Sequence, residues 1–181
     1  MDDKELTYHP TEATELRPFA VMPEVEAIRT HPLYCKWYAR LKDCETDREY
    51  CRHGADHLIG AARIAYIMVL EQGLPYSKEL IYATALLHDI GKAAQYECGD
   101  PHEVVGEGIA RQILSDIDGF TDQEKEQIVH AVREHRRYDR SSSELGRILY
   151  AADKASRLCF DCDARGTCSW PDEKKNMNVR I

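Results

Sequence analysis

Apolar residues recur every three or four positions along most of this chain, which is the spacing of a helix with one buried face. The clearest series runs through Ala61, Ile64 and Met68 and ends at a Gly73-Leu74-Pro75 turn, where glycine and proline stop a helix. The other predicted helices begin at a proline or at a residue that can cap a helix N-terminus. Further helices are expected to begin near Pro23, Pro32, Ser77, Pro101, Thr121 and Ser142 or Ser143.

The same pattern predicts an all-α fold, because no stretch alternates apolar and polar residues for long. Residues 23–155 should form a single-domain helical bundle, with a turn through residues 96–100 after Gly91. Residues 1–22 lack a sustained period and are expected to be an N-terminal arm, extended or partly disordered. Residues 156–181 are expected to be a cysteine-containing C-terminal tail.

The segment from Ala83 to Lys92 is an apolar helix that leads directly into an imidazole and a carboxylate, His88 and Asp89. Burying both groups is costly unless they are paired or bind a metal. Four more metal-competent side chains lie on the apolar faces of other predicted helices. The expected metal ligands, in chain order, are His57, His88, Asp89, His102, His135 and Asp153.

A shared metal centre explains this recurrence better than separate causes do. Any one histidine alone is more often a surface residue or a hydrogen-bonded core residue, and Asp153 alone could be a surface carboxylate. Five helices that each bury a polar side chain would need five separate hydrogen-bond solutions, whereas metal binding on facing helices satisfies them all. Imidazole and carboxylate ligands suit iron, manganese, nickel, cobalt or zinc.

Two other histidines need a separate interpretation. His53 precedes His57 by one helical turn and is the alternative first ligand, but His57 is preferred because it begins the apolar stripe. His130 lies off the apolar face of its predicted helix and is expected to face solvent.

Charge and composition restrict the partners. The 32 acidic and 24 basic residues give a formal charge of −8, which opposes binding to a nucleic acid polymer or an anionic membrane. No apolar run approaches the roughly 20 residues of a membrane-spanning helix. The first five residues have no basic or apolar signal region. We therefore expect a cytoplasmic protein.

With these ligands identified, residues 57–154 resemble the HD superfamily of metal-dependent phosphohydrolases. The first histidine of the family corresponds to His57, and its signature pair corresponds to His88-Asp89 within Leu-Leu-His-Asp-Ile-Gly-Lys. The last aspartate of the family corresponds to Asp153 in Tyr-Ala-Ala-Asp-Lys. His102 and His135 match the two extra histidines of dinuclear members.

The resemblance implies an HD-type bundle that holds two divalent or trivalent metal ions, with iron favoured by analogy. One ion would bind His57, His88, Asp89 and Asp153. The second would bind His102 and His135, and Asp89 would bridge the two. Two such ions would share a hydroxide and polarise a phosphoryl oxygen, so hydrolysis of a phosphoester or phosphoanhydride bond is the implied reaction.

The expected partner is a small phosphorylated molecule, with a nucleotide favoured, because the resemblance is closest to small bacterial members that split dinucleoside polyphosphates. The guanosine-polyphosphate hydrolases of the superfamily carry an acidic pair shortly after His-Asp. Here Lys92-Ala93-Ala94 follows instead, which argues against that substrate. Homo-oligomer formation is left open by the sequence.

Several cations follow the metal ligands and could bind phosphate. The expected substrate-binding residues are Lys92, Arg136, Arg137 and Lys154, and Asp89 and Lys92 are the expected catalytic residues. The alternative for these cations is ordinary solvation at the rim of the bundle. Two other functions share the ligand set: a mixed-valent di-iron oxygenase of the same superfamily, and a non-catalytic module that senses a nucleotide or a metal.

The seven cysteines suggest reduced thiols or metal ligands rather than disulfides. Cys159, Cys162 and Cys168 lie beyond the last predicted helix. With a fourth thiol they could bind a structural zinc or an iron–sulfur cluster. That fourth thiol would come from Cys35, Cys44, Cys51 or Cys98. The alternative is that three reduced thiols pack the tail.

Overall fold

The structure is a computed structural model that describes residues 20–179, and within this range it is all-helical, as the pattern predicted. None of the helices described is long and apolar enough to cross a membrane. The α-helices are α1 (Pro23–Thr30), α2 (Pro32–Cys44), α3 (Ala55–Gln72), α4 (Lys78–Leu87), α5 (Lys92–Cys98), α6 (His102–Ser115), α7 (Asp122–Glu134) and α8 (Glu144–Ala155). Short 3-10 helices follow as η1 (Cys159–Asp161), η2 (Asp163–Gly166) and η3 (Asp172–Lys174).

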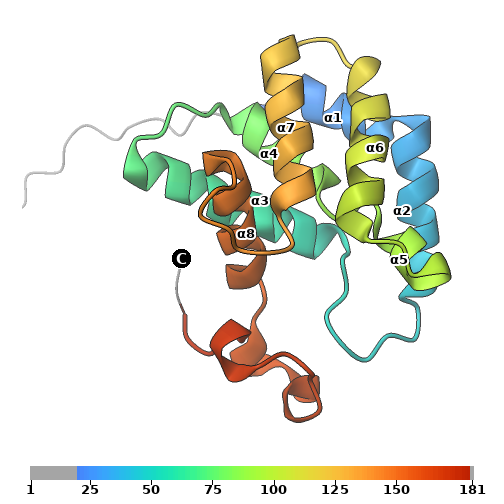
Figure 1. Ribbon diagram of the computed structural model, residues 1–181, viewed down its shortest axis with the longest axis vertical. Helices are drawn as coiled ribbons and strands as arrows, with labels where there is room; N and C mark the ends of the chain where they lie inside the picture. Colours follow the sequence, from blue (N-terminus) through green and yellow to red (C-terminus); the bar gives the residue numbers. More distant parts are fainter. Residues whose placement is uncertain (1–19, 180–181) are drawn as a thin grey trace, which may run out of the picture.

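The helices pack around α3, α4 and α7. Helix α3 lies against α4 and α8, while α7 lies against α4, α6 and α8, and α2 lies against α5 (Figure 1). Ile81, Leu87, Ile128 and Leu149 are among the fully buried side chains of this core. Each such side chain contributes about 1.5–3 kcal/mol through burial. The tail after α8 lies at one end of the bundle, in the lower part of the view.

Several predicted helix ends are confirmed. Helix α3 ends at Gly73, which has φ 62°, a left-handed conformation that suits glycine. Ser77 caps α4 by accepting a hydrogen bond from the backbone nitrogen of Leu80. Thr121 and Glu124 form the predicted capping box of α7, and Ser143 rather than Ser142 caps α8.

Two local predictions were wrong. The segment expected to turn through residues 96–100 is helical up to Cys98, because Ala93 and Ala94 are buried and hold a short helix in place. His53 was expected on the same helix as His57, but α3 begins only at Ala55. The four-residue spacing between His53 and His57 therefore extends beyond the helix into the loop that precedes it. Most of the predicted N-terminal arm, residues 1–22, lies outside the described residues.

Gly91 allows the start of α6 to approach the turn that follows α4. A Cβ atom at Gly91 would lie 2.2 Å from the carbonyl oxygen of His102 and 2.6 Å from the backbone nitrogen of Gly106. Both are backbone atoms, so relief of the clash requires α6 to move. The φ angle of Gly91 is −82°, which any residue can adopt. The requirement for glycine here therefore comes from close packing.

Replacing Gly91 with alanine should lower the free energy of unfolding by about 1–3 kcal/mol, because the added methyl group overpacks two backbone segments. Gly108→Ala on α6 is a matched control, since nothing lies within 4 Å of its Cβ position. Alanine favours a helix interior over glycine by about 0.5–1 kcal/mol. Urea denaturation should therefore move the two variants in opposite directions, and equal midpoints would contradict the close approach.

Candidate metal centre

The six predicted ligands lie at helix ends that meet in the interior. His57 and His102 are in the first turns of α3 and α6, and Asp153 is in the last turn of α8. The backbone of His88 and His135 follows directly after α4 and α7. All six residues are buried: His57, His88, Asp89, His102, His135 and Asp153. The bundle therefore brings together His57 and Asp153, which are 96 positions apart in the sequence.

The first group consists of His57, His88, Asp89 and Asp153. The Nε2 atom of His88 lies 3.0 Å from Oδ2 of Asp89. The Nε2 atom of His57 lies 3.5 Å from the same Oδ2 and 3.3 Å from Oδ1 of Asp153. The two Nε2 atoms are 3.3 Å apart. Four ligand atoms from α3, α8 and the turn after α4 thus surround a single position.

The second group consists of Asp89, His102 and His135. The other oxygen of Asp89, Oδ1, lies 3.6 Å from Nε2 of His102 and 3.5 Å from Nε2 of His135. These two Nε2 atoms are 3.1 Å apart. Each oxygen of the Asp89 carboxylate therefore faces a different pair of histidines. This is the arrangement expected of a carboxylate that bridges two metal ions.

The Nδ1 atoms of His88 and His135 are held by backbone carbonyls. His88 Nδ1 donates to the carbonyl oxygen of Ala85 at 2.6 Å, and His135 Nδ1 donates to that of Val132 at 2.7 Å. A carbonyl oxygen can only accept, so Nδ1 carries the proton in both rings. In the neutral form of each ring the lone pair is then on Nε2, which is the form that binds a metal.

His57 and His102 are oriented by side chains. The Nδ1 atom of His102 lies 2.8 Å from Oε1 of Gln95, which accepts its hydrogen bond. The hydroxyl of Ser156 donates to the carbonyl oxygen of Asp153, so its oxygen is free to accept from Nδ1 of His57 at 2.9 Å. In the neutral form of these rings the lone pair is likewise on Nε2. Neither Gln95 nor Ser156 had a distinguishing signal in the sequence.

Bare Nε2 lone pairs that face each other and a carboxylate repel unless a cation lies between them. Both groups have this character, and the imidazole and carboxylate donors suit first-row transition metal ions. The residues therefore fit a dinuclear centre, in which metal ions would lie between the histidines and Asp89. Asp153 also pairs with Lys154 of the chain through its Oδ2 atom.

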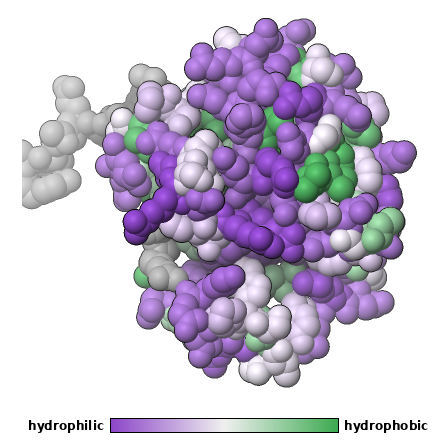
Figure 2. Space-filling model, viewed as in Figure 1, coloured by the Kyte–Doolittle hydropathy of each residue, from purple (hydrophilic) through white to green (hydrophobic). Residues whose placement is uncertain are grey.

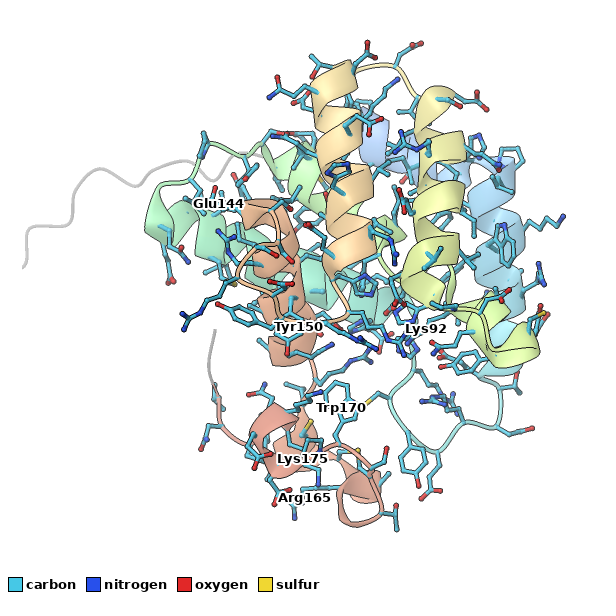
Figure 3. The ribbon with its side chains drawn as sticks, viewed as in Figure 1. Lys92, Glu144, Tyr150, Arg165, Trp170 and Lys175 are labelled. Carbon is cyan, nitrogen blue, oxygen red and sulfur yellow. The ribbon has the colours of Figure 1, made fainter. Side chains whose placement is uncertain are left out.

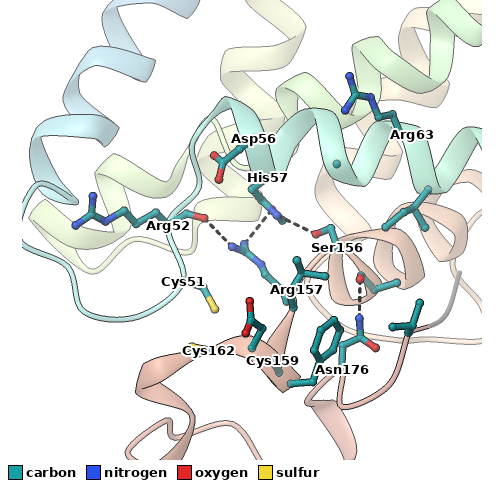
Figure 4. Close-up of a pocket in the computed structure, with 17 residues that line it drawn as sticks. Cys51, Arg52, Asp56, His57, Arg63, Ser156, Arg157, Cys159, Cys162 and Asn176 are labelled. Atoms are coloured by element: carbon teal, nitrogen blue, oxygen red, sulfur yellow. Dashed lines mark hydrogen bonds between the residues drawn. The ribbon is translucent and has the colours of Figure 1, made fainter.

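The fourth histidine, His57, also meets a cation of the chain. Arg157 donates from Nη2 to Nε2 of His57 at 2.9 Å and from Nη1 to the carbonyl oxygen of Arg52 at 2.6 Å (Figure 4). The Nε atom of Arg157 is buried and has no hydrogen-bond partner. A metal ion at the first group would take over the lone pair of His57, so Arg157 would have to withdraw from that atom.

Both aspartates are ionised at neutral pH. Burial alone would raise the pKa of Asp89, but His88 and the other histidines around it hold that pKa well below its usual range. Burial also opposes ionisation of Asp153, and His57 and Lys154 outweigh it. The centre therefore offers two carboxylates for metal binding without first losing protons.

His53 occupies a position that the sequence did not predict. Its backbone nitrogen donates to Oε2 of Glu45 at 2.7 Å, and its Nδ1 atom donates to Oε1 of the same buried carboxylate. Tyr96 donates to Oε1 of Glu45 at 2.8 Å. Burial lowers the pKa of His53, so its Nε2 atom is unprotonated and lies 3.8 Å from Oδ2 of Asp89. His53 thus stands beside the first group rather than replacing His57 in it.

A cleft of about 270 Å³ opens onto the centre. Three of the four cations expected to bind substrate line it: Lys92, Arg136 and Lys154. Arg137 is exposed and is not among the lining residues. Trp170 and Lys174 of the tail complete the wall, and Figure 3 shows Trp170 reaching toward the helical body on the side where Lys92 lies. Figure 2 shows the hollow between body and tail.

The family model described as "HD domain" matches residues 54–158, which is more than half of the 181 residues and includes all six ligands. This chain belongs to the HD domain family. The crystal structure of a predicted HD superfamily hydrolase from an uncultured Thermotogales bacterium matches it with a TM-score of 0.59 and 21% identity, over 82% of each chain. At that identity the match shows a shared HD fold.

Relatives of this HD domain include an uncharacterized protein of Clostridium beijerinckii, 42% identical over 146 residues, which are 81% of this chain and 91% of that protein. Ribonuclease Y of Frankia casuarinae is 35% identical over 100 residues, 55% of this chain and 14% of the enzyme. Ribonuclease Y of Pelobacter propionicus is 31% identical over 126 residues, 70% of this chain and 22% of the enzyme. The chain thus spans a small part of these ribonucleases.

Removing His135 should separate the two metal positions. In the His135→Ala variant we expect bound metal to fall from about two ions per chain toward one, because only the second group loses a ligand. His130→Ala is the control, since His130 is exposed on the same helix. Elemental analysis after gel filtration measures the ratio. Equal metal content in the two variants would contradict a second ion at His102 and His135.

The metal-free protein should lose stability in mild acid through His102. Burial, and then the charge of Lys92, lowers the pKa of His102 from 6.5 to about 2. Because the pKa is lower in the folded protein, the unfolded chain takes up the proton first as the pH falls. The contribution of His102 to the free energy of unfolding is therefore complete above pH 6.5 and declines below it. For one proton the decline is at most about 1.4 kcal/mol per pH unit.

Denaturant titrations of the chelated protein between pH 7 and pH 5 measure this slope. His102→Gln should flatten it, and His130→Gln should leave it unchanged. Parallel curves for wild type and His102→Gln would show that His102 is not held neutral by its surroundings.

Proposed function

We propose that this HD domain is a metal-dependent phosphohydrolase that cleaves a phosphoester or phosphoanhydride bond of a small substrate, with nucleotides favoured. The observation that carries the proposal is the Asp89 carboxylate shared between two histidine groups at the floor of a cationic cleft. Two metal ions, when bound, supply an acidified water molecule and an electrophile for the phosphoryl oxygen. Among the candidate metals, iron is favoured.

The cations of the cleft suit phosphate binding. Lys92, the first residue of α5, lines the cleft, with Nζ 3.4 Å from Oε1 of Gln95. Burial lowers the pKa of Lys92, while Asp89 and Asp153 act in the opposite sense and favour its charged form. Arg136 already holds Glu103 with two hydrogen bonds of 3.1 and 3.0 Å, so it contributes less net charge than Lys92 does.

His53 is suited to accept a proton during hydrolysis. Its Nδ1 hydrogen is fixed on the ionised Glu45, and its Nε2 lone pair faces the cleft beside Asp89. Burial lowers the pKa of His53, and the hydrogen bond to Glu45 opposes that fall, because the carboxylate stabilises the imidazolium that forms when Nε2 takes up a proton. We assign His53 the role of receiving a proton from the attacking water.

The cleft favours a small substrate over a polymer. Its volume of about 270 Å³ lies near the lower end of ligand pockets, which begin at about 300 Å³. Trp170 lies 5.2 Å from Lys154 Nζ, measured to the ring centroid, which puts an aromatic face beside a cation. That pairing suits a nucleobase next to its phosphates. Relatives named ribonuclease Y support phosphodiester chemistry in the family, but the charge of −8 disfavours an RNA polymer here.

The reaction class can be tested by incubating the metal-loaded protein with nucleotides and dinucleotides without oxygen. Release of phosphate or a nucleoside phosphate would support the proposal. Oxygen-dependent turnover with no phosphate release would instead favour the oxygenase chemistry of the superfamily. Binding of nucleotides with neither reaction would favour a sensing module.

Lys92→Ala should lower kcat/KM for the substrate so identified by about 10- to 100-fold, the cost of losing one charged hydrogen bond to phosphate. Lys36→Ala is the control, because Lys36 is exposed on α2 and does not line the cleft. Metal content should stay unchanged in both variants. An unaltered kcat/KM in Lys92→Ala would remove Lys92 from the substrate site.

A further inference from the structure

Four of the seven cysteines gather beside the metal centre. Cys51 precedes α3, and together with Cys159 and Cys162 it lines a cavity of about 690 Å³ whose wall also includes His57 and Arg157 (Figure 4). Cys168 is brought to the same loop by its neighbour, because Tyr50 donates to the carbonyl oxygen of Thr167 at 3.4 Å. The tail and the loop before α3 therefore place these four thiols in one region of the molecule.

The remaining three thiols lie elsewhere. Cys35, Cys44 and Cys98 are exposed on α2 and α5, whereas Cys159 is buried and Cys51, Cys162 and Cys168 are half-buried. The sequence left Cys35, Cys44, Cys51 and Cys98 as possible partners of the tail cysteines. Among these, Cys51 lines the same cavity as Cys159 and Cys162. The exposed three are a natural set of controls.

The four thiols affect one another electrostatically. Burial raises the pKa of the Cys51 thiol, Arg157 opposes this rise, and each of the three tail thiols adds to it. Thiols in this arrangement resist becoming thiolates together unless a cation compensates them. Arg157 supplies part of that compensation.

The tail lacks a hydrophobic core that would hold it. Between residues 158 and 179 the only buried apolar residues are Cys159 and Ala164, whereas Leu158 and Val179 are 60% and 91% exposed. Its helices are three 3-10 turns of three or four residues. Ordering each residue costs about 1–2 kcal/mol, and small segments without a core usually depend on a metal or a disulfide.

We propose that Cys51, Cys159, Cys162 and Cys168 bind a structural zinc ion that fastens the tail to the loop before α3. This site is separate from the histidine and aspartate centre and does not depend on the proposed hydrolysis. A Cys-x-x-Cys pair, with a third thiol six residues later and a fourth from another segment, is a ligand set that zinc accepts. Each thiol releases its proton to solvent on binding.

Zinc binding must also draw the loop and the tail together. Within residues 20–179 no three thiols have sulfur atoms that all lie within 4.8 Å of one another, in contrast to the two histidine and aspartate groups. Ordering of the tail and binding of zinc are therefore coupled. Because Trp170 and Lys174 of the tail line the catalytic cleft, the zinc site also holds one wall of that cleft in place.

Zinc content in an Asp89→Ala background tests the proposal, because this change removes the carboxylate that both histidine and aspartate groups share. Elemental analysis of the full chain should find about one zinc per chain. Adding Cys162→Ser or Cys51→Ser should remove it, and adding Cys44→Ser should not. Zinc retained in the Cys51 and Cys162 variants, or absent from the Asp89→Ala protein, would overturn the proposal.

A second measurement covers the case in which the cysteine variants fail to fold. Zinc-edge X-ray absorption of the Asp89→Ala protein should show sulfur ligands at about 2.3 Å. A shell of nitrogen or oxygen at about 2.0–2.1 Å would overturn the assignment. So would a mass spectrum of the denatured chain that shows disulfides, or an iron content with visible absorption in place of zinc.

Discussion

The structure depends on a single buried carboxylate. Asp89 is 3% exposed, and removing an ionised group from water costs several kcal/mol unless compensation is nearly complete. Metal ions held between Asp89 and the histidines would supply that compensation. The histidines lie at the ends of four helices, so α3, α4, α6 and α7 converge with their termini rather than their middles. Gly91 has no side chain because the backbone of α6 must come within contact distance for His102 to reach Asp89.

Much of this could be predicted from the sequence, because the ligands are coupled to helical periodicity. A polar residue that continues an apolar stripe must face the interior, so His57, His102 and Asp153 were placed without a structure. Capping residues fixed the starts of α4 and α7 for a similar reason, since a capping side chain acts on the backbone two or three positions away. Periodicity and capping rules were therefore sufficient for features that depend on residues a few positions apart in the sequence.

Contacts between distant segments could not be found in this way. The pairing of His53 with Glu45 and Tyr96 depends on a loop path that no period describes, and the approach of Arg157 to His57 depends on how α8 ends. Residue type alone also placed Arg137 with Arg136 at the substrate, whereas Arg136 is half-buried and lines the cleft and Arg137 is exposed and does not line it. The sequence could not choose Cys51 as the partner of the tail cysteines, because that choice also depends on a contact between distant segments.

The central claim is that Asp89 bridges two metal ions, and crystals of the metal-loaded protein test it most directly. An anomalous difference map recorded at the absorption edge of the bound metal locates each ion without reference to activity. We expect two peaks about 3.5–4 Å apart, one beside each oxygen of the Asp89 carboxylate. A single peak at this site, or two peaks that do not both contact Asp89, would contradict it.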